Sequence, residues 1–232
     1  MNGAQPICAV TGASGYVGGR LNAAIQSTGW KTVSWSRRSS VGKPFPFQLG
    51  QDVNPDSFAG IQALVHCAYD FQARNWGEIV TKNVRGSEKL FRAAKAAGVA
   101  QIVFISSLSS FPGCRSLYGK AKLEIESIAS AHGATIIRPG LVHGATAGGV
   151  FGGLVKQVKQ GRIIPLLGFG RQLQYLVHEA DLSKLVIRAI NGEFKTSTPI
   201  TLAAPHPWLM RDLLAHLAKA LNKRISFVPI PW

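Results

Sequence analysis

Residues 7–18, the stretch that decides the fold, read Ile7-Cys8-Ala9-Val10-Thr11-Gly12-Ala13-Ser14-Gly15-Tyr16-Val17-Gly18. A short apolar run leads into Gly12, Gly15 and Gly18, and a segment with helical apolar spacing follows at once. This order predicts a strand, a tight glycine turn and a helix. The helix directs unpaired N–H groups and a partial positive charge at the turn. A pyrophosphate is the usual occupant of such a turn.

Strands and helices alternate along the rest of the first 140 residues. The apolar patterns predict strands near 6–11, 31–36, 45–49, 62–68, 101–106 and 134–138, and helices near 16–28, 78–97 and 117–131. The run Ile102–Ile105 is apolar on both faces, as in a parallel sheet that helices cover on both sides. We therefore predict an α/β fold, a Rossmann-type doubly wound parallel sheet.

After Pro139-Gly140 the sequence becomes rich in glycine turns. Further elements are expected near 150–160 (helix), 173–177 (strand), 179–191 (helix), 199–203 (strand), 208–222 (helix) and 225–229 (strand). We expect a dinucleotide-binding domain over 1–145. Residues 146–232 are expected to form a small, shortened C-terminal substrate lobe that shares elements with the first domain.

Composition excludes several classes of protein. Hydrophobic residues make up 46% of the 232-residue chain, which indicates a globular rather than a disordered protein. No apolar run approaches the ~18 residues of a membrane span, and no secretory signal opens the chain, so we expect no membrane partner. Cys8, Cys67 and Cys114 lack metal-ligand spacing; reduced thiols in the cytoplasm and no metal site are expected.

The net charge of +15 is unusual and admits several partners. One basic stripe has helical spacing: Lys82, Arg85, Lys89 and Arg92. We interpret it as a solvated helix face, with a subunit contact or an anionic-ligand field as alternatives. A nucleic-acid partner is not expected, because no aromatic residues interleave with the cations.

A candidate catalytic group follows the predicted strand 101–106. Tyr118 and Lys122 are four residues apart, which places them on one face of a helix. A lysine ammonium beside a phenol is expected to lower the pKa of the phenol and make it a general acid or base. Ser107 lies at the strand end, where open α/β sheets bind ligands, and its hydroxyl is placed to hold a substrate oxygen.

Seven ordered motifs resemble those of extended short-chain dehydrogenases/reductases of the NAD(P)-dependent epimerase/dehydratase type. They are residues 11–18, Asp52-Val53, Val65-His66-Cys67-Ala68, Asn83-Val84-Arg85-Gly86, Phe104-Ile105-Ser106-Ser107, Tyr118-Gly119-Lys120-Ala121-Lys122 and Arg138-Pro139-Gly140-Leu141-Val142-His143-Gly144, and residues 177–182 resemble a later substrate-side segment. The resemblance covers nearly the whole chain. It implies that Tyr118 transfers a proton, that Lys122 binds the nicotinamide ribose and that Ser107 orients the substrate oxygen.

The candidate site residues follow from these motifs and from the strand ends. The catalytic set is Ser107, Tyr118, Lys122 and Asn83. The cofactor-binding set is Gly12, Ser14, Gly15, Tyr16, Val17, Gly18, Arg37, Arg38, Asp52, Val53, Cys67, Ala68, Tyr69, Asn83, Ile105, Tyr118, Lys122, Pro139, Gly140 and Val142.

The end of the second strand bears on the choice of cofactor. NAD-selective folds place a carboxylate there to accept from the ribose 2′-OH, but this strand ends in Arg37-Arg38. Arginines form charge-assisted bonds to a 2′-phosphate, so we expect NADP in preference to NAD. The alternative is that both arginines are ordinary surface residues on a turn.

The histidines and one further arginine are weaker candidates. His66 is interpreted as a packed, hydrogen-bonded residue rather than a catalyst. His143 follows the Pro139-Gly140 turn and is a weak candidate to face the substrate. His178 is expected at a helix N-terminus, where the acids that follow complement the dipole. Arg171 is either a phosphate contact or a solvent-exposed loop residue.

The sequence thus predicts an NAD(P)-dependent oxidoreductase or epimerase that acts on a carbonyl or alcohol carbon. The substrate is a nucleotide-activated sugar or another small carbonyl compound. Leu108 and Ser109 stand where the family's dehydratases carry an acid after the serine, which disfavours elimination, and the chain is shorter than the family's usual length. The alternative is a non-catalytic cofactor-binding or assembly protein. By analogy with relatives, a homodimer through helices 78–97 and 117–131 is expected.

Overall fold

The computed structural model describes residues 5–37 and 45–231. The chain folds as two compact units, the first formed by Met1–Pro139 and Ala180–Thr201 and the second by Gly140–Glu179 and Leu202–Trp232. Arg38, one of the candidate cofactor residues, lies outside the described residues. The domain boundary expected after residue 145 stays a prediction.

A seven-stranded sheet with the order β11-β6-β5-β4-β1-β2-β3 is the centre of the first unit. Its strands are β1 (Ile7–Thr11), β2 (Lys31–Ser36), β3 (Phe45–Pro46), β4 (Ala63–His66), β5 (Gln101–Ile105), β6 (Thr135–Pro139) and β11 (Ile200–Leu202). Neighbours from β6 to β3 pair in parallel. The predicted Rossmann-type sheet is confirmed. The strand expected over 45–49 is shorter than predicted and ends at Pro46, although the Phe47 N–H still donates to the Ser36 carbonyl at 3.2 Å.

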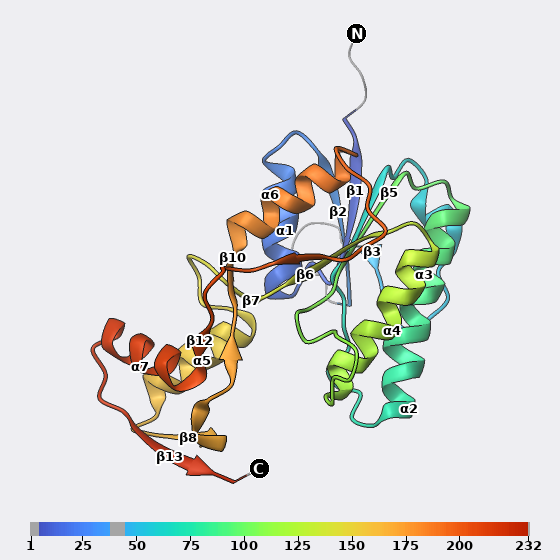
Figure 1. The fold of residues 1–232 in the computed structure, drawn as a ribbon. Coiled ribbons are helices and arrows are strands. Elements are labelled where there is room, and N and C mark those ends of the chain that lie inside the picture. Colours follow the sequence, from blue (N-terminus) through green and yellow to red (C-terminus); the bar gives the residue numbers. More distant parts are fainter. Residues whose placement is uncertain (1–4, 38–44, 232) are drawn as a thin grey trace. The chain divides into compact units, whose positions relative to one another are not determined.

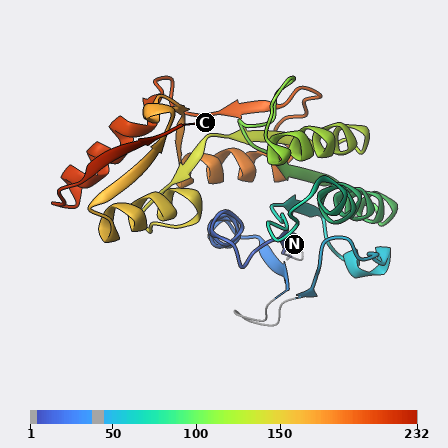
Figure 2. The same ribbon diagram turned by 90° about the horizontal axis from the view of Figure 1, so that it is seen from below.

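Helices cover both faces of this sheet (Figures 1 and 2). They are α1 (Tyr16–Gln26), α2 (Trp76–Ile79), α3 (Arg85–Ala96), α4 (Leu117–Ala131) and α6 (Glu179–Ile190), with a short 3₁₀ turn, η1, at Pro55–Phe58. The single helix predicted over 78–97 is interrupted by a π-helical turn, η2 (Val80–Val84). In Figure 1, α3 and α4 lie side by side on one face of the sheet, and α1 and α6 lie on the other.

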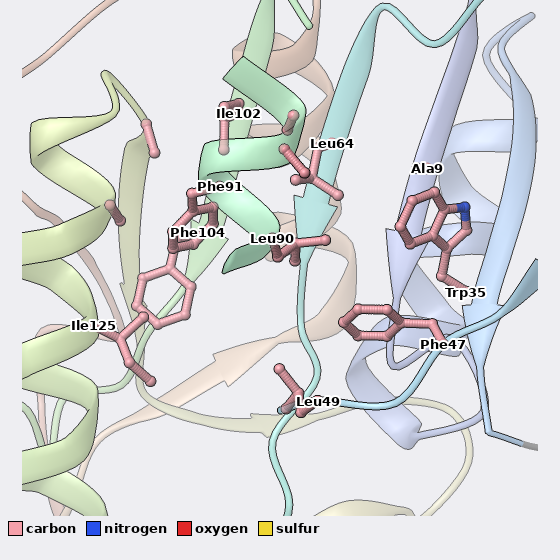
Figure 3. Close-up of a cluster of buried hydrophobic side chains, with 14 of the residues drawn as sticks. Ala9, Trp35, Phe47, Leu49, Leu64, Leu90, Phe91, Ile102, Phe104 and Ile125 are labelled. Atoms are coloured by element: carbon pink, nitrogen blue, oxygen red, sulfur yellow. The ribbon is translucent and has the colours of Figure 1, made fainter. Parts of the chain in front are cut away.

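The core of the first unit is aromatic at two places (Figure 3). Trp35 is fully buried and stacks on Phe45, with ring centroids 4.5 Å apart. Phe91 of α3 and Phe104 of β5 pack edge to face at 5.9 Å, and Ile125 of α4 lies beside them in Figure 3. These rings anchor β2 and β5, the strands whose carboxyl ends carry candidate site residues.

The second unit contains three two-stranded sheets. They pair β7 (Leu141–His143) with β10 (Leu176–His178), β9 (Leu173–Gln174) with β12 (Trp208–Leu209), and β8 (Ile163–Leu167) with β13 (Ser226–Ile230), and the helices are α5 (Gly149–Gln160), α7 (Met210–Ala220) and the 3₁₀ turn η3 (Gly168–Gly170).

Several predictions for this second unit were wrong in detail. The strand expected over 173–177 is two short strands, β9 and β10. The helix expected to begin at Trp208 begins at Met210, because Trp208 pairs with Gln174. Strands β7 and β8 were not predicted. Pro165 argues against a strand in the sequence, but β8 tolerates a proline because it pairs with a neighbouring strand on one side alone.

Candidate active site

The glycine turn after β1 forms a cradle that side chains would fill. Gly12 has a φ of +67°, and a Cβ there would lie 2.9 Å from the backbone of Ala68. A Cβ on Gly18 would lie 2.3 Å from the Gly12 carbonyl oxygen. Helix α1 begins after Gly15 with no side-chain cap and no acid in its first turn, so neither feature neutralises the positive end of the helix dipole that faces the turn. The cradle fits a pyrophosphate.

Gly18→Ala tests this cradle. The added Cβ cannot fit without moving the Gly12 carbonyl, so we expect NADPH to bind about tenfold more weakly or worse, a loss on the order of 1.4 kcal/mol. The control is Gly153→Ala in α5, where a Cβ meets nothing within 4 Å and alanine favours the helix. Fluorescence titration with NADPH measures both variants. Equal affinity of Gly18→Ala and the wild type would remove the cradle from the cofactor site.

A buried histidine fastens the loop that faces the cradle. His66 Nδ1 lies 2.7 Å from Thr11 Oγ1, and His66 Nε2 lies 3.0 Å from Ser87 Oγ. Ser87 donates to the Asn83 carbonyl, so its oxygen accepts from Nε2–H and Thr11 donates to Nδ1. Burial lowers the His66 pKa to about 3 and keeps the ring neutral. The interpretation of His66 as a packed residue is confirmed.

The loop after β4 is held at both ends. Thr11 Oγ1 accepts from the N–H groups of Cys67, at 3.1 Å, and Ala68, at 3.3 Å. The buried Asn83 amide binds the backbone of Asp70 with both of its polar atoms, at 2.6 and 3.2 Å. Asn83 therefore shapes the loop. A direct contact of Asn83 with cofactor stays a prediction.

Ser107 and Tyr118 come together at the carboxyl end of β5. Ser116 caps α4 by accepting from the Gly119 N–H. A Cβ on Gly119 would lie 2.3 Å from the Ser109 carbonyl oxygen, so the start of α4 packs tightly on the turn after Ser107. Burial raises the pKa of Tyr118, and a hydrogen bond to Ser107 counteracts that rise. The pair presents one phenol and one hydroxyl at the same place.

Lys122 lies beside Tyr118 but acts differently from what the sequence suggested. Its Nζ donates to the Ile105 carbonyl at 2.8 Å and lies 5.9 Å from the centroid of the Tyr118 ring. Burial lowers the Lys122 pKa to about 8. The expectation that Lys122 lowers the pKa of Tyr118 is wrong in this structure, because the ammonium is directed at a carbonyl and burial dominates the Tyr118 pKa.

A buried ion pair beneath the site was missed in the sequence. Glu126 lies one helical turn beyond Lys122 and accepts from Ser106 Oγ at 2.5 Å. Its two carboxylate oxygens also accept hydrogen bonds from Nε and Nη2 of Arg138. The pair joins α4, the end of β5 and the end of β6. The spacing of Lys122 and Glu126 is visible in the sequence, but the partner on another strand is not.

Aromatic rings surround the phenol. The Tyr69 ring meets Tyr118 edge-on at 5.0 Å, and the Phe71 ring stacks on Tyr118 at 5.8 Å. Phe71 is 74% exposed, which is unusual for a large apolar side chain. No feature of the sequence around Phe71 distinguishes it from other apolar residues, so it was not predicted as a site residue.

Arg37 and Asp52, two of the candidate cofactor-binding residues, form ion pairs with other side chains. Arg37 Nη1 and Lys82 Nζ lie 3.9 and 4.0 Å from the same oxygen of the buried Asp70. Asp52 is exposed and pairs with Lys89 at 2.9 Å, and that hydrogen bond lowers the Asp52 pKa. The basic stripe, which runs from η2 into α3, thus includes two residues engaged in ion pairs, Lys82 and Lys89, and is not a purely solvated face.

The remaining predicted residues lie as follows. Ile105 ends β5, and Pro139 ends β6 and accepts from the Leu108 N–H. Gly140 and Val142 belong to the second unit, where Val142 pairs with Val177. Ser14, Tyr16 and Val17 lie at the cradle and the first turn of α1, and Val53 packs against the core. His178 ends β10 directly before α6, and Arg171 follows η3.

Comparison with known proteins identifies the class. The model of the NAD dependent epimerase/dehydratase family matches residues 8–199, and the chain belongs to this family. Within the described residues, no group of three or more His, Cys, Asp or Glu side chains is arranged to hold a metal.

Relatives in sequence are distant. The chain is 25% identical over 222 residues to an uncharacterised protein of Mycobacterium tuberculosis, with 92% of this chain and 23% of that protein covered. It is 27% identical over 197 residues to the ceramide reductase of Caulobacter vibrioides, covering 79% and 61% of the two chains. The chain thus spans about a quarter of the length of the mycobacterial relatives it matches.

Solved structures show the same fold. MoeE5 in complex with UDP-glucose and NAD superposes with a TM-score of 0.85 at 21% identity, covering 97% of this chain and 85% of that one. The UDP-N-acetylglucosamine 4-epimerase of Bacillus cereus gives 0.80 at 17% identity, covering 97% and 85%.

Proposed function

We propose that this protein is an NADP(H)-dependent oxidoreductase or epimerase that acts on a carbonyl or alcohol carbon, with Tyr118 as proton donor and acceptor. One observation carries the proposal. The loop 67–69 connects the two halves of the site, because Ala68 lies against Gly12 in the cradle and Tyr69 packs on Tyr118. A dinucleotide held in the cradle and a substrate held at Tyr118 would therefore share one loop.

The residues present fit a nicotinamide dinucleotide. Its pyrophosphate would lie on the glycine cradle and the uncapped start of α1, and Lys122 would supply a donor for the ribose. When bound, this cofactor supplies or accepts a hydride at the substrate carbon. The chain contributes the alignment of the two reacting carbons and the proton.

Tyr118 and Ser107 divide the proton chemistry. Burial raises the Tyr118 pKa, so the phenol is protonated at neutral pH and ready to protonate a carbonyl oxygen during reduction. Ser107 then holds that oxygen and stabilises the phenolate through their hydrogen bond. In the oxidative direction the same two groups would take the proton from an alcohol.

The substrate is proposed to be a nucleotide-activated sugar or another small carbonyl compound. The structural neighbour MoeE5 was solved in complex with UDP-glucose, and another neighbour is a UDP-N-acetylglucosamine 4-epimerase. The net charge of +15 suits a diphosphate. Turnover of UDP-glucose and UDP-N-acetylglucosamine, followed by chromatography of the products, tests this class. Turnover of uncharged ketones alone would favour the small carbonyl class.

Cofactor choice is tested by Arg37. We expect NADPH to bind more tightly than NADH, and Arg37→Ala to weaken NADPH binding about tenfold to a hundredfold while leaving NADH nearly unchanged, since a charge-assisted hydrogen bond is worth about 1.5–3 kcal/mol. The control is Arg74→Ala, which removes an exposed arginine that follows the loop after β4. Calorimetry measures both cofactors. Tighter binding of NADH to the wild type would overturn the preference.

We further propose that the protein works in the cytoplasm, without a nucleic-acid partner, as a homodimer. Burial raises the pKa values of Cys8 and Cys67 to about 12, which suits permanently reduced thiols. The helices expected at the dimer contact, 78–97 and 117–131, pack on one another within the chain. Sedimentation velocity tests the dimer, and a monomer at micromolar concentration would contradict it.

A further inference from the structure

The small sheet of β8 and β13 in the second unit has one covered face. Ile164 and Leu166 of β8 are buried against α5 and α7, together with Val158 and Leu214. Figure 1 shows the two strands side by side along these helices. This face is an ordinary small core.

The opposite face of the same sheet is apolar and exposed. Ile163 is 66% exposed and Leu167 52%, while Val228 is 47% and Ile230 42% exposed. The parallel register pairs Ile230 with Leu167 and Val228 with the exposed Pro165, so these side chains lie on one face. Aliphatic side chains gathered on a surface in this way mark a contact site. We call these five residues the apolar face.

Cations gather at the amino-terminal end of the same two strands. A hollow of about 550 Å³ lies there between the loops that lead into β8 and β13. Lys159, Arg162, Lys223 and Arg224 line it, and no acidic residue does. In the part of the chain that the structure describes, none of the four forms an ion pair with a carboxylate. We call these four residues the basic rim.

We propose that the apolar face and the basic rim together dock the second unit on the surface of an anionic lipid bilayer. The cations would bind lipid phosphates while the aliphatic side chains enter the boundary between headgroups and acyl chains. Charge complementarity identifies the occupant, because the rim carries four positive charges and no negative one beside an apolar surface that water solvates poorly.

A nucleic acid fits this surface less well. Proteins bind single-stranded nucleic acids by stacking the bases on aromatic side chains, but the apolar face consists of aliphatic residues and one proline. The proposal departs from the sequence-based expectation of no membrane partner, which rested on the absence of a spanning run. No helix within residues 5–37 and 45–231 is long and apolar enough to cross a bilayer, and surface docking does not require one.

Co-sedimentation of the whole chain with vesicles tests the proposal. One set is phosphatidylcholine alone and the other is equal parts of phosphatidylcholine and phosphatidylglycerol. We expect binding to the anionic vesicles, weakened by salt, and little binding to the neutral ones. Equal binding to both, or to neither, would overturn the proposal.

Two triple variants separate the basic rim from the overall charge. Arg162→Gln, Lys223→Gln and Arg224→Gln together should weaken partition about a hundredfold, since each basic residue near an anionic surface contributes about 1 kcal/mol. The matched control removes three exposed lysines of the first unit: Lys31→Gln, Lys95→Gln and Lys195→Gln. It should retain most of the binding. Equal losses in the two variants would reduce the effect to general attraction and refute the site.

A double variant tests the apolar face. Ile163→Ser and Val228→Ser alter exposed positions, so the fold and NADPH binding should persist, while vesicle binding falls about tenfold or more. Unchanged vesicle binding would refute the apolar contribution. Two other results would replace the bilayer with another occupant: tighter, rim-dependent binding to a single-stranded RNA, or self-association in sedimentation velocity that the serine substitutions abolish.

Discussion

Tyr118→Phe is expected to lower turnover about 10²–10⁴-fold while NADPH binds with nearly wild-type affinity. Phenylalanine keeps the ring that packs against Tyr69 and Phe71, so the packing of the loop survives. It removes the hydroxyl that bonds to Ser107 and with it the proton donor. The measurement is the rate of NADPH oxidation with a substrate that the wild type reduces, beside fluorescence titration of the cofactor.

The control for Tyr118→Phe is Tyr69→Phe, which removes the hydroxyl of the neighbouring ring. Ser107, the residue proposed to hold the substrate oxygen, bonds to the Tyr118 hydroxyl, whereas Tyr69 meets Tyr118 through its ring. We expect Tyr69→Phe to keep most of the activity. Wild-type turnover in Tyr118→Phe would refute the proton-transfer role, and loss of NADPH binding would indicate damage to the cofactor site instead.

The order of elements in the first unit could be predicted because each depends on local pattern. The glycines at 12, 15 and 18 require close backbone approach, and the structure shows that approach at Ala68. Helix α4 was predicted with its observed limits, since Ser116 caps its start and its apolar face repeats with helical period. Local chemistry decides both features, so one sequence suffices to find them.

Features that depend on non-local contacts were harder to predict. Four-residue spacing places Tyr118 and Lys122 on one helix face, but it does not say that Nζ binds the carbonyl of Ile105 on a neighbouring strand. Phe71 stacks on Tyr118 because of the path that the loop after β4 takes. Asn83, in the π-helical turn, fixes that path by binding the backbone of Asp70. Side-chain direction and loop path need the fold.

The second unit was predicted less well because its strands are short and pair as isolated ribbons. β9 and β12 have two residues each, too few for alternation to show. β8 does alternate, with Ile164 and Leu166 inward, but its outward positions are apolar as well. The apolar residues at these outward positions obscured the alternation that indicates a half-buried strand. The same residues belong to the apolar face that is proposed to bind a bilayer.

Removal of the buried Glu126 carboxylate is expected to have the largest effect on stability. Glu126 is 4% exposed and holds Arg138 through both of its oxygens, with Ser106 as a third partner. Glu126→Ala would leave the Arg138 guanidinium, whose side chain is 22% exposed, without its partner. Loss of one member of a buried pair costs about 3–5 kcal/mol in free energy of unfolding. Urea denaturation measures it.

Two comparison variants show whether the pairing or the side-chain volume matters. Glu124→Ala, on the exposed face of the same helix, should change stability by less than about 0.5 kcal/mol. The double variant Glu126→Met with Arg138→Met should recover most of the loss, because it buries neither charge alone. A double variant as unstable as Glu126→Ala would show that shape rather than charge pairing holds α4 on the two strand ends.

The ion pair also bears on catalysis, since it fixes the helix that carries Tyr118 and Lys122 to the strand end that carries Ser107. Glu126→Gln retains an acceptor for Ser106 while weakening the hold on Arg138. We expect it to lower kcat more than it weakens NADPH binding, because displacement of the phenol by a fraction of an ångström misaligns proton transfer. If the Glu126→Gln variant is less stable than the wild type but has the same kcat, the ion pair contributes to folding and not to catalysis.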